Sequence, residues 1–134
     1  MSGREVKAFI DTKVARVCRC ADSVIEVRMR DGAVVALPEM EEILAAQVEL
    51  VQGPCVVLVD SRPINSMTRE AQERTANTAS DRDTRAVAIL IDSPVSALLG
   101  NFFLTLGRPV YPTRLFRNED EARAWLLGYQ AELT

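Results

Sequence analysis

Apolar and charged residues alternate along residues 24–30, which predicts a β-strand with two different faces. The apolar face carries Ile25, Val27 and Met29, and the charged face carries Glu26, Arg28 and Arg30. A looser alternation over residues 12–20 predicts a strand before it. Asp31-Gly32 follows, and a two-residue hairpin turn requires such residues because both of its central positions take positive φ. We therefore expect residues 33–37 to return as a strand antiparallel to residues 24–30.

This hairpin register exposes two apolar side chains. If Arg30 pairs with Ala33, then Val35 and Leu37 lie on the charged face of the hairpin. They are then either ordinary surface hydrophobic residues or part of a contact between subunits. Val35 and Leu37 are therefore candidate oligomer contacts.

The middle of the chain alternates between helical and strand patterns. Residues 38–51 have apolar residues at helical spacing and acidic residues in the first turn, which predicts an amphipathic helix. Continuous apolar runs at residues 55–59 and 85–91 predict strands that are buried on both faces, as in a parallel sheet. A polar helix is expected between these strands, over about residues 68–79.

The last third of the chain continues the alternation. A helix is expected after residue 92, with Leu104 on the side opposite its apolar stripe as a third candidate oligomer contact. Residues 110–116 predict a strand, and the proline within it favours a sheet edge. Asn118 then caps the last helix. We expect one α/β domain over residues 1–134: a mixed sheet with an N-terminal antiparallel hairpin, parallel interior strands and about four helices.

Composition narrows the possible functions. The chain has 134 residues, 48% of them hydrophobic, which is enough for one domain with its own core. Its net charge of -3 gives no general attraction to nucleic acid. Histidine is absent, which removes the commonest general base and metal ligand, and no glycine-rich phosphate loop is present. We expect no cofactor and no metal site, and three reduced cysteines in a cytoplasmic protein without a transmembrane segment.

Polar residues that follow the interior strands are candidates for ligand binding. Ligands of open α/β sheets usually bind at the carboxyl ends of the strands, where Asp60, Asp92 and Ser93 are found. The two aspartates either form a carboxylate pair, for a metal ion or for acid–base chemistry, or cap the loops that they begin. Ser66 and Thr68 follow the first of these strands, and Thr68 is placed as the N-cap of the next helix.

The order of these segments resembles the STAS superfamily, whose type members are bacterial anti-sigma-factor antagonists such as SpoIIAA. The resemblance is carried by the strand "CVVLVD", the hydroxyl-bearing loop before the helix, the strand "AVAILID" and the closing "TRLFRNEDEARAWL". It implies a SpoIIAA-like mixed sheet. In the antagonists, a serine at the start of the helix after the first of these strands is phosphorylated and controls docking. Ser66 and Thr68 are the corresponding candidates for phosphorylation or partner contact.

The resemblance also implies that the protein acts by binding a partner. We expect a non-catalytic protein-interaction or regulatory module that binds a protein partner or a second copy of itself as a homodimer. The alternative is a small-ligand domain of the same fold that binds a nucleotide, an anion or a lipid. Because the fold also resembles lipid-carrying Sec14-like domains, contact with lipid stays open.

Overall fold

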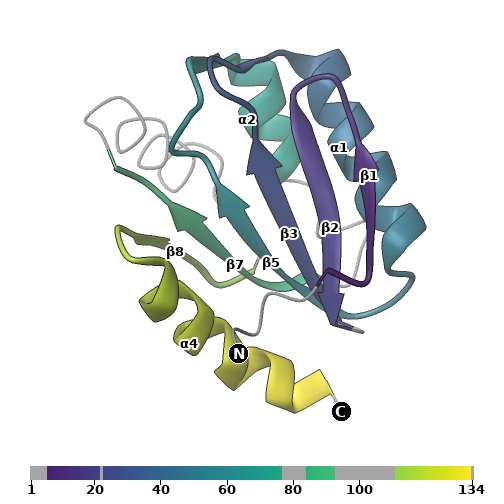
Figure 1. The fold of residues 1–134 in the computed structure, drawn as a ribbon, viewed down its shortest axis with the longest axis vertical. Coiled ribbons are helices and arrows are strands. Elements are labelled where there is room, and N and C mark those ends of the chain that lie inside the picture. Colours follow the sequence, from purple (N-terminus) through teal and green to yellow (C-terminus); the bar gives the residue numbers. More distant parts are fainter. Residues whose placement is uncertain (1–5, 22, 77–83, 93–110, 134) are drawn as a thin grey trace.

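A six-stranded mixed sheet lies at the centre of the protein. The computed structural model describes residues 6–21, 23–76, 84–92 and 111–133. The strands are β1 (Ala8–Asp11), β2 (Ala15–Ala21), β3 (Val24–Met29), β5 (Cys55–Asp60), β7 (Thr84–Leu90) and β8 (Thr113–Phe116). They lie in the order β1-β2-β3-β5-β7-β8 (Figure 1). β1, β2 and β3 pair antiparallel, and β3, β5, β7 and β8 pair parallel, which confirms the predicted mixed sheet.

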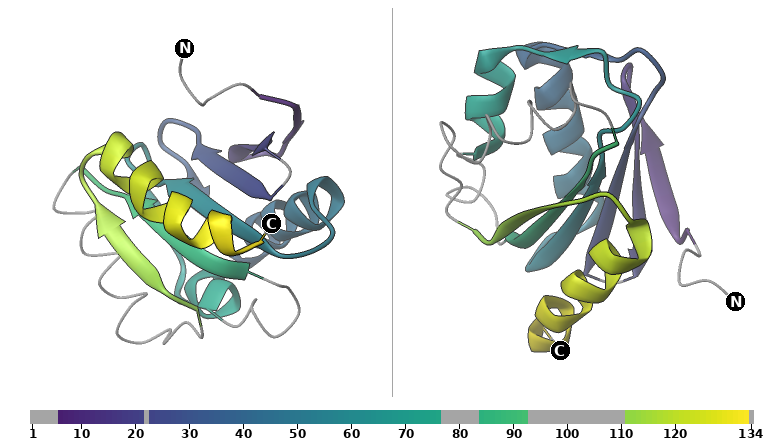
Figure 2. Two further views of the ribbon diagram at one scale, coloured as in Figure 1. Left: turned by 90° about the horizontal axis from the view of Figure 1, so that it is seen from below. Right: turned by 90° about the vertical axis from the view of Figure 1, so that its left-hand side faces the viewer.

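Helices cover both faces of this sheet. α1 (Leu37–Leu50) and α2 (Arg69–Ala76) pack on one face, and α4 (Glu119–Gln130) packs on the other and leads into a short 3₁₀ turn, Ala131–Leu133 (Figure 2). The described residues thus contain three α-helices. The fourth predicted helix, with the candidate residues Ser93 and Leu104, lies outside the described residues. No helix in the described ranges is long and apolar enough to cross a membrane.

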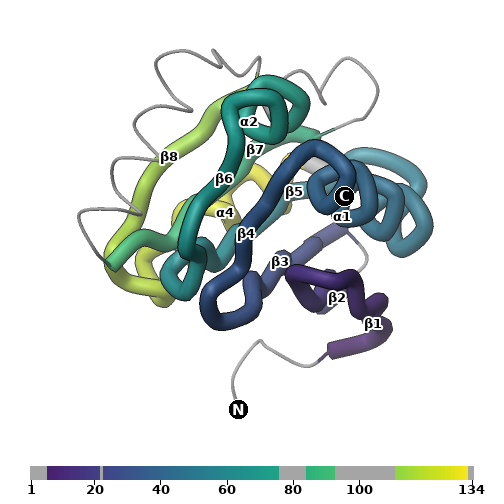
Figure 3. Tube along the Cα trace, turned by 90° about the horizontal axis from the view of Figure 1, so that it is seen from above, coloured from purple at the N-terminus to yellow at the C-terminus, as the bar shows by residue number. Residues whose placement is uncertain are grey.

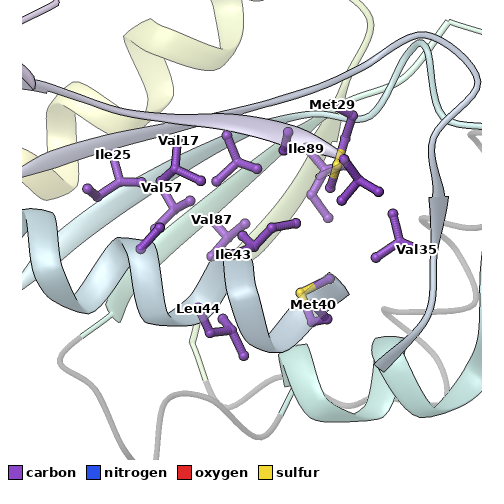
Figure 4. Packing of buried hydrophobic residues seen from close by; sticks show 14 of the residues in the cluster. Val17, Ile25, Met29, Val35, Met40, Ile43, Leu44, Val57, Val87 and Ile89 are labelled. Atoms are coloured by element: carbon purple, nitrogen blue, oxygen red, sulfur yellow. The ribbon is translucent and has the colours of Figure 1, made fainter. Parts of the chain in front are cut away.

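The interior strands divide their side chains between two cores. Val57 and Val87 belong to the larger core beneath α1, whereas Leu58 and Leu90 belong to the smaller core beneath α4. Because successive side chains of a strand point to opposite faces, strands covered on both sides are apolar at nearly every position. In Figure 4 Ile43 of α1 lies next to Val87 of the sheet, within the larger core.

The predicted return of residues 33–37 along β3 is wrong. The turn itself forms: Gly32 has φ 73°, and the amide of Ala33 donates to the carbonyl of Arg30 at 3.1 Å. However, β5 already occupies the second edge of β3, with Val27 opposite Val59. The chain therefore leaves the sheet, and β4 (Val34–Val35) pairs in parallel with β6 (Ser66–Met67) as a separate two-stranded ribbon (Figure 3).

This change of pairing reverses which side chains are exposed. Val35 is fully buried in the larger core, while Val34 beside it is 54% exposed. Val35 is therefore excluded as an exposed oligomer contact, because its side chain points into the core from the ribbon. Leu37, at the start of α1, is 38% exposed, as expected for a surface residue.

Two smaller features of the fold differ from the sequence pattern. α1 buries Met40, Ile43, Leu44, Ala46 and Gln47, whereas Val48, one of the apolar residues at helical spacing in this segment, is 48% exposed. β1 was not expected, and it forms one edge of the sheet with Phe9 half exposed. β8 forms the opposite edge, as the proline before it predicts.

Candidate functional site

The segment after β5 connects the sheet to the ribbon and then to α2. Ser61 is buried, and its hydroxyl donates to the carbonyl of Leu90 at 2.7 Å, which ties the end of β5 to the end of β7. The amide of Asn65 donates to the carbonyl of Ala33 at 2.8 Å, which holds the segment against the ribbon. These bonds fix the path of residues 61–68 at the carboxyl ends of the parallel strands.

Thr68 caps α2, as the sequence predicts. Its Oγ1 accepts a hydrogen bond from the amide of Ala71 at 3.2 Å, the third residue of the helix. Its carbonyl accepts from the amide of Gln72 at 3.1 Å, which begins the helical ladder. This side chain therefore satisfies one of the amides that a helix start leaves without an intrahelical partner.

We expect Thr68→Ala to lower the free energy of unfolding by about 1 kcal/mol, because the amide of Ala71 loses this partner. Ser66→Ala is the matched control, since Ser66 is exposed and lies outside the helix. Urea unfolding of both variants measures the difference. Equal stability of the two variants would show that the Thr68 hydroxyl contributes nothing to the helix start.

The exposed face of the ribbon carries Ser66 and an apolar side chain. Ser66 is directly opposite Val34 in the parallel pairing, and both are exposed, whereas their neighbours Met67 and Val35 point inward. We call the exposed pair Val34 and Ser66 the ribbon surface. Ser66 lies shortly before α2, and Val34 lies shortly before α1, which begins at Leu37. A candidate modification site thus lies beside one of the most exposed large apolar residues of the described chain.

Asp60, the candidate ligand at the end of β5, is engaged by two arginines. Its carboxylate accepts from Arg62 Nε at 2.8 Å and from Arg62 Nη2 at 2.8 Å. It also accepts from Arg28 Nη1 at 3.1 Å. Only 8% of Asp60 is exposed. The carboxylate is therefore already neutralised by protein side chains at the strand end.

These residues belong to a larger ion cluster of three arginines and three carboxylates. It consists of Glu26, Arg28, Asp60, Arg62, Glu119 and Arg123. Arg28 is at its centre: its guanidinium donates to Glu26 Oε1 at 2.7 Å and to the two carboxylate oxygens of Glu119 at 2.9 and 3.0 Å. Arg123 pairs with Glu119 and with the second oxygen of Glu26. The cluster joins β3 and β5 to the first turn of α4.

The contacts within the cluster favour the charged forms of Asp60 and Arg28. Burial raises the pKa of Asp60, but the hydrogen bonds and positive charge of Arg62 and Arg28 outweigh burial, and the net pKa is lowered. Burial lowers the pKa of Arg28, but the bonds to Glu119 and Glu26 outweigh it and leave that pKa above its ordinary value. A general acid at neutral pH needs a raised carboxyl pKa, and the lowered pKa of Asp60 does not provide one.

Stability should fall in acid because of Asp60. Its folded pKa lies below its unfolded value of about 3.9, so its contribution is complete above that value and is lost as the pH falls through the folded pKa. We expect Asp60→Asn to flatten the decline of unfolding free energy below about pH 4. Glu49→Gln, on the exposed side of α1, is the control. Identical pH profiles for wild type and Asp60→Asn would contradict the assignment.

Of the other strand-end candidates, Asp92 is not opposite Asp60 in the sheet, and Ser93 lies outside the described residues. In the β5–β7 pairing Asp60 is opposite Leu90, so Asp92 follows two residues beyond, where it is exposed. Within the described ranges no group of three His, Cys, Asp or Glu residues is arranged to hold a metal ion. Cys18, Cys20 and Cys55 are buried cysteines, and burial with the nearby Glu26 charge raises the pKa of Cys20 to about 12.

Sequence reasoning missed the ion cluster. The charges of Glu26 and Arg28 suggested a solvated face, yet Glu26 is only 3% exposed. One signal was available in the sequence. β3 lies between two other strands, and if a helix covers its charged face, that helix must carry charges of opposite sign. Glu119 and Arg123, four residues apart on α4, supply them.

Comparison with known proteins agrees with this architecture. The profile of a domain of unknown function, DUF7793, matches residues 18–130. No curated protein matches. A solved structure of an uncharacterised protein from the DUF3478 family of Shewanella loihica PV-4, described as having a SpoIIAA-like fold, is similar at a TM-score of 0.52. The two chains share 11% identity over 89% of this chain and 90% of that one, which supports a common fold. The protein described here therefore has a SpoIIAA-like fold and belongs to the DUF7793 family.

Proposed function

We propose that the protein is a non-catalytic interaction module whose partner-facing region is the ribbon surface. The observation that carries the proposal is the position of Ser66 directly opposite the 54% exposed side chain of Val34. An exposed apolar residue gains free energy when a partner covers it. A serine beside it supplies a point at which the contact is controlled.

Phosphorylation of Ser66 would change this surface in two ways. A phosphate adds nearly two negative charges, which must be desolvated if a partner covers Val34, and this disfavours an apolar contact. The same charges lie close to the amino terminus of α2, where the helix dipole favours anions. The modified form is therefore compatible with the fold and unfavourable for docking.

The proposed partner is a protein, with a second copy of this chain as the first choice. A homodimer with two-fold symmetry brings the same surface of both copies together, so one apolar patch serves both sides. Leu37, which follows the ribbon surface at the start of α1, adds a second exposed apolar residue of this region. A net charge of -3 disfavours nucleic acid as the partner, and we place the module in the cytoplasm.

Catalysis is not part of the proposal. The chain has no histidine, and the buried carboxylate of Asp60 is paired with Arg28 and Arg62. A module that acts by binding a partner needs no side chain that transfers protons.

Sedimentation velocity of wild type, Val34→Asp and Val48→Asp tests the proposal. Val48 is the matched control, because it is 48% exposed on α1. We expect a dimer that Val34→Asp dissociates and Val48→Asp retains. If wild type is a monomer, immobilised wild type and Val34→Asp are compared for proteins retained from host lysate. A monomer that retains the same proteins with and without Val34 would overturn the proposal.

A further inference from the structure

β1 leaves one edge of the central sheet open. It pairs with β2 on one side, with Phe9 opposite Cys18, and no other strand of the described ranges pairs with its outer side. In Figure 3 β1 lies at the rim of the molecule, next to β2. An exposed strand edge is a template for pairing with a second chain, because its outward amides and carbonyls can extend the sheet. This edge belongs to the central sheet and not to the ribbon.

The outward backbone groups of β1 belong to alternate residues. The amide of Thr12, just after β1, donates to the carbonyl of Ala15 in β2 at 2.8 Å. Because the backbone of an antiparallel strand points alternately toward its partner and away from it, Ile10 faces β2 as Thr12 does. Phe9 and Asp11 alternate with them and direct their amides and carbonyls outward. Within the described part of the chain, these outward groups accept and donate no hydrogen bond.

The side chains around Phe9 make two copies of β1 complementary to each other. Lys7 lies two residues before Phe9, and Asp11 lies two residues after it. If two such strands pair antiparallel about a two-fold axis at Phe9, each Lys7 is opposite the partner's Asp11, and the two Phe9 rings are opposite each other. Opposite charges and aromatic pairs stabilise such a pairing, whereas like charges destabilise it. An axis at Lys7 or at Asp11 would place identical charges opposite each other, so the charges select the axis at Phe9.

The three side chains of this pairing are accessible. Lys7 is exposed, and Phe9 is 50% exposed although the guanidinium of Arg16 lies over its ring at 4.1 Å from the centroid. The side chain of Asp11 is 40% exposed although its carboxylate accepts hydrogen bonds from Arg16 and Arg30. A lysine from a second copy can therefore reach this carboxylate from the solvent side.

We propose that two copies of this chain join their β1 strands antiparallel about Phe9 and form one continuous sheet. Each Phe9 amide donates to the partner's Phe9 carbonyl, and each Asp11 amide donates to the partner's Lys7 carbonyl. The Lys7 carbonyl points outward, because a trans peptide directs it opposite to the amide of Ala8, which faces β2. An edge of four residues buries less area than a standard interface, so this contact is weak and forms at high protein concentration. It does not depend on the ribbon surface.

Hydrogen exchange of single amides, followed by NMR spectroscopy, tests this pairing. Val34→Asp is the background, because it removes the proposed ribbon contact, and exchange is measured at two protein concentrations that differ about a hundredfold. We expect exchange at Phe9 and Asp11 to slow at least about twofold at the higher concentration, since a half-populated dimer protects these amides half of the time.

Leu115 is the control for the exchange measurement. It lies on β8 at the opposite edge, and it faces outward because the carbonyl of the next residue, Phe116, accepts from the amide of Ile91. Its exchange rate should not change with concentration. Unchanged rates at Phe9 and Asp11, or equal slowing at Leu115, would overturn the proposal whether or not the ribbon surface binds a partner.

Charge reversal in the same background assigns the register. Lys7→Glu places two carboxylates opposite each other in the proposed pairing, and Asp11→Lys places two ammonium groups opposite each other, so neither variant alone should slow exchange at Phe9. In an equal mixture each chain of one variant faces opposite charges on the other, and exchange at Phe9 should slow again. Both variants keep a net negative charge, so general attraction does not explain such a result.

A mixture that exchanges at Phe9 as fast as the separate variants would contradict the axis at Phe9. Asp11→Lys also removes the bonds to Arg16 and Arg30 within the chain. If this variant does not fold, the concentration dependence at Phe9 in the Val34→Asp background still decides the proposal.

Discussion

Replacing Arg28 with methionine is expected to lower the free energy of unfolding by about 3–5 kcal/mol. Among the described residues, Arg28 is the one guanidinium that contacts Glu26, Asp60 and Glu119 together. Its removal leaves carboxylates buried with too few positive charges, and the penalty of an unpaired buried charge exceeds the value of an ordinary ion pair. Guanidinium unfolding at pH 7 measures the loss.

Arg16→Met is the matched control for this prediction. Arg16 also donates two hydrogen bonds to one carboxylate, that of Asp11, but both side chains are largely exposed. Exposed ion pairs contribute little to stability, so this variant should lose far less stability than Arg28→Met. If Arg28→Met and Arg16→Met cost the same, the ion cluster does not fasten α4 to the sheet.

Val35→Asp is expected to cost at least about 3 kcal/mol of unfolding free energy, because it places a carboxylate in the larger core. Val34→Asp, one residue earlier, should change the stability of the monomer by no more than about 0.5 kcal/mol, because the side chain is exposed on the single chain. Thermal and urea unfolding of the two variants compare them directly.

This pair of variants separates the two possible registers of residues 33–37. A hairpin with β3 exposes Val35 and buries Val34, whereas the ribbon with β6 does the opposite. A larger loss of unfolding free energy for Val34→Asp than for Val35→Asp would show that residues 33–37 pair with β3 as a hairpin.

The sequence pattern predicts those parts of the fold that local chemistry decides. β5 and β7 are apolar at almost every position, which only strands buried on both faces require. Asn118 accepts from the amide of Glu121 at 3.0 Å, as an N-cap should, and Thr68 does the same for α2. These features depend on a few neighbouring residues, so their signals are present in short stretches of sequence.

Features that depend on competition between distant segments were not predictable in the same way. Asp31-Gly32 correctly indicates a turn, but whether the chain then pairs with β3 depends on β5, which comes later and covers that edge. The ion cluster likewise combines residues of β3, β5 and α4, and its Arg28–Glu119 pair joins residues that are 91 positions apart. Asp60 was recognised as a strand-end residue, but its arginine partners, Arg28 on β3 and Arg62 just after β5, were not.

The same distinction applies to the candidate site. Thr68 could be recognised as a cap from its position before a helical pattern. The pairing of Ser66 with Val34 could not, because it depends on a two-residue ribbon formed by segments about thirty positions apart. Because β4 pairs with β6, the proposed contact residue is Val34 and not Val35. Val34 is opposite Ser66, the serine that the STAS resemblance makes a candidate for phosphorylation.

Crosslinking from position 34 in the host cell tests the interaction role most directly. A photoreactive amino acid replaces Val34 in one variant and Val48 in another, and crosslinked products are identified by mass spectrometry after illumination. The account predicts a discrete product from position 34, either a dimer or one partner protein, that Ser66→Glu abolishes and position 48 does not yield. Equal products from both positions, or none from position 34, would contradict the ribbon surface as the docking site.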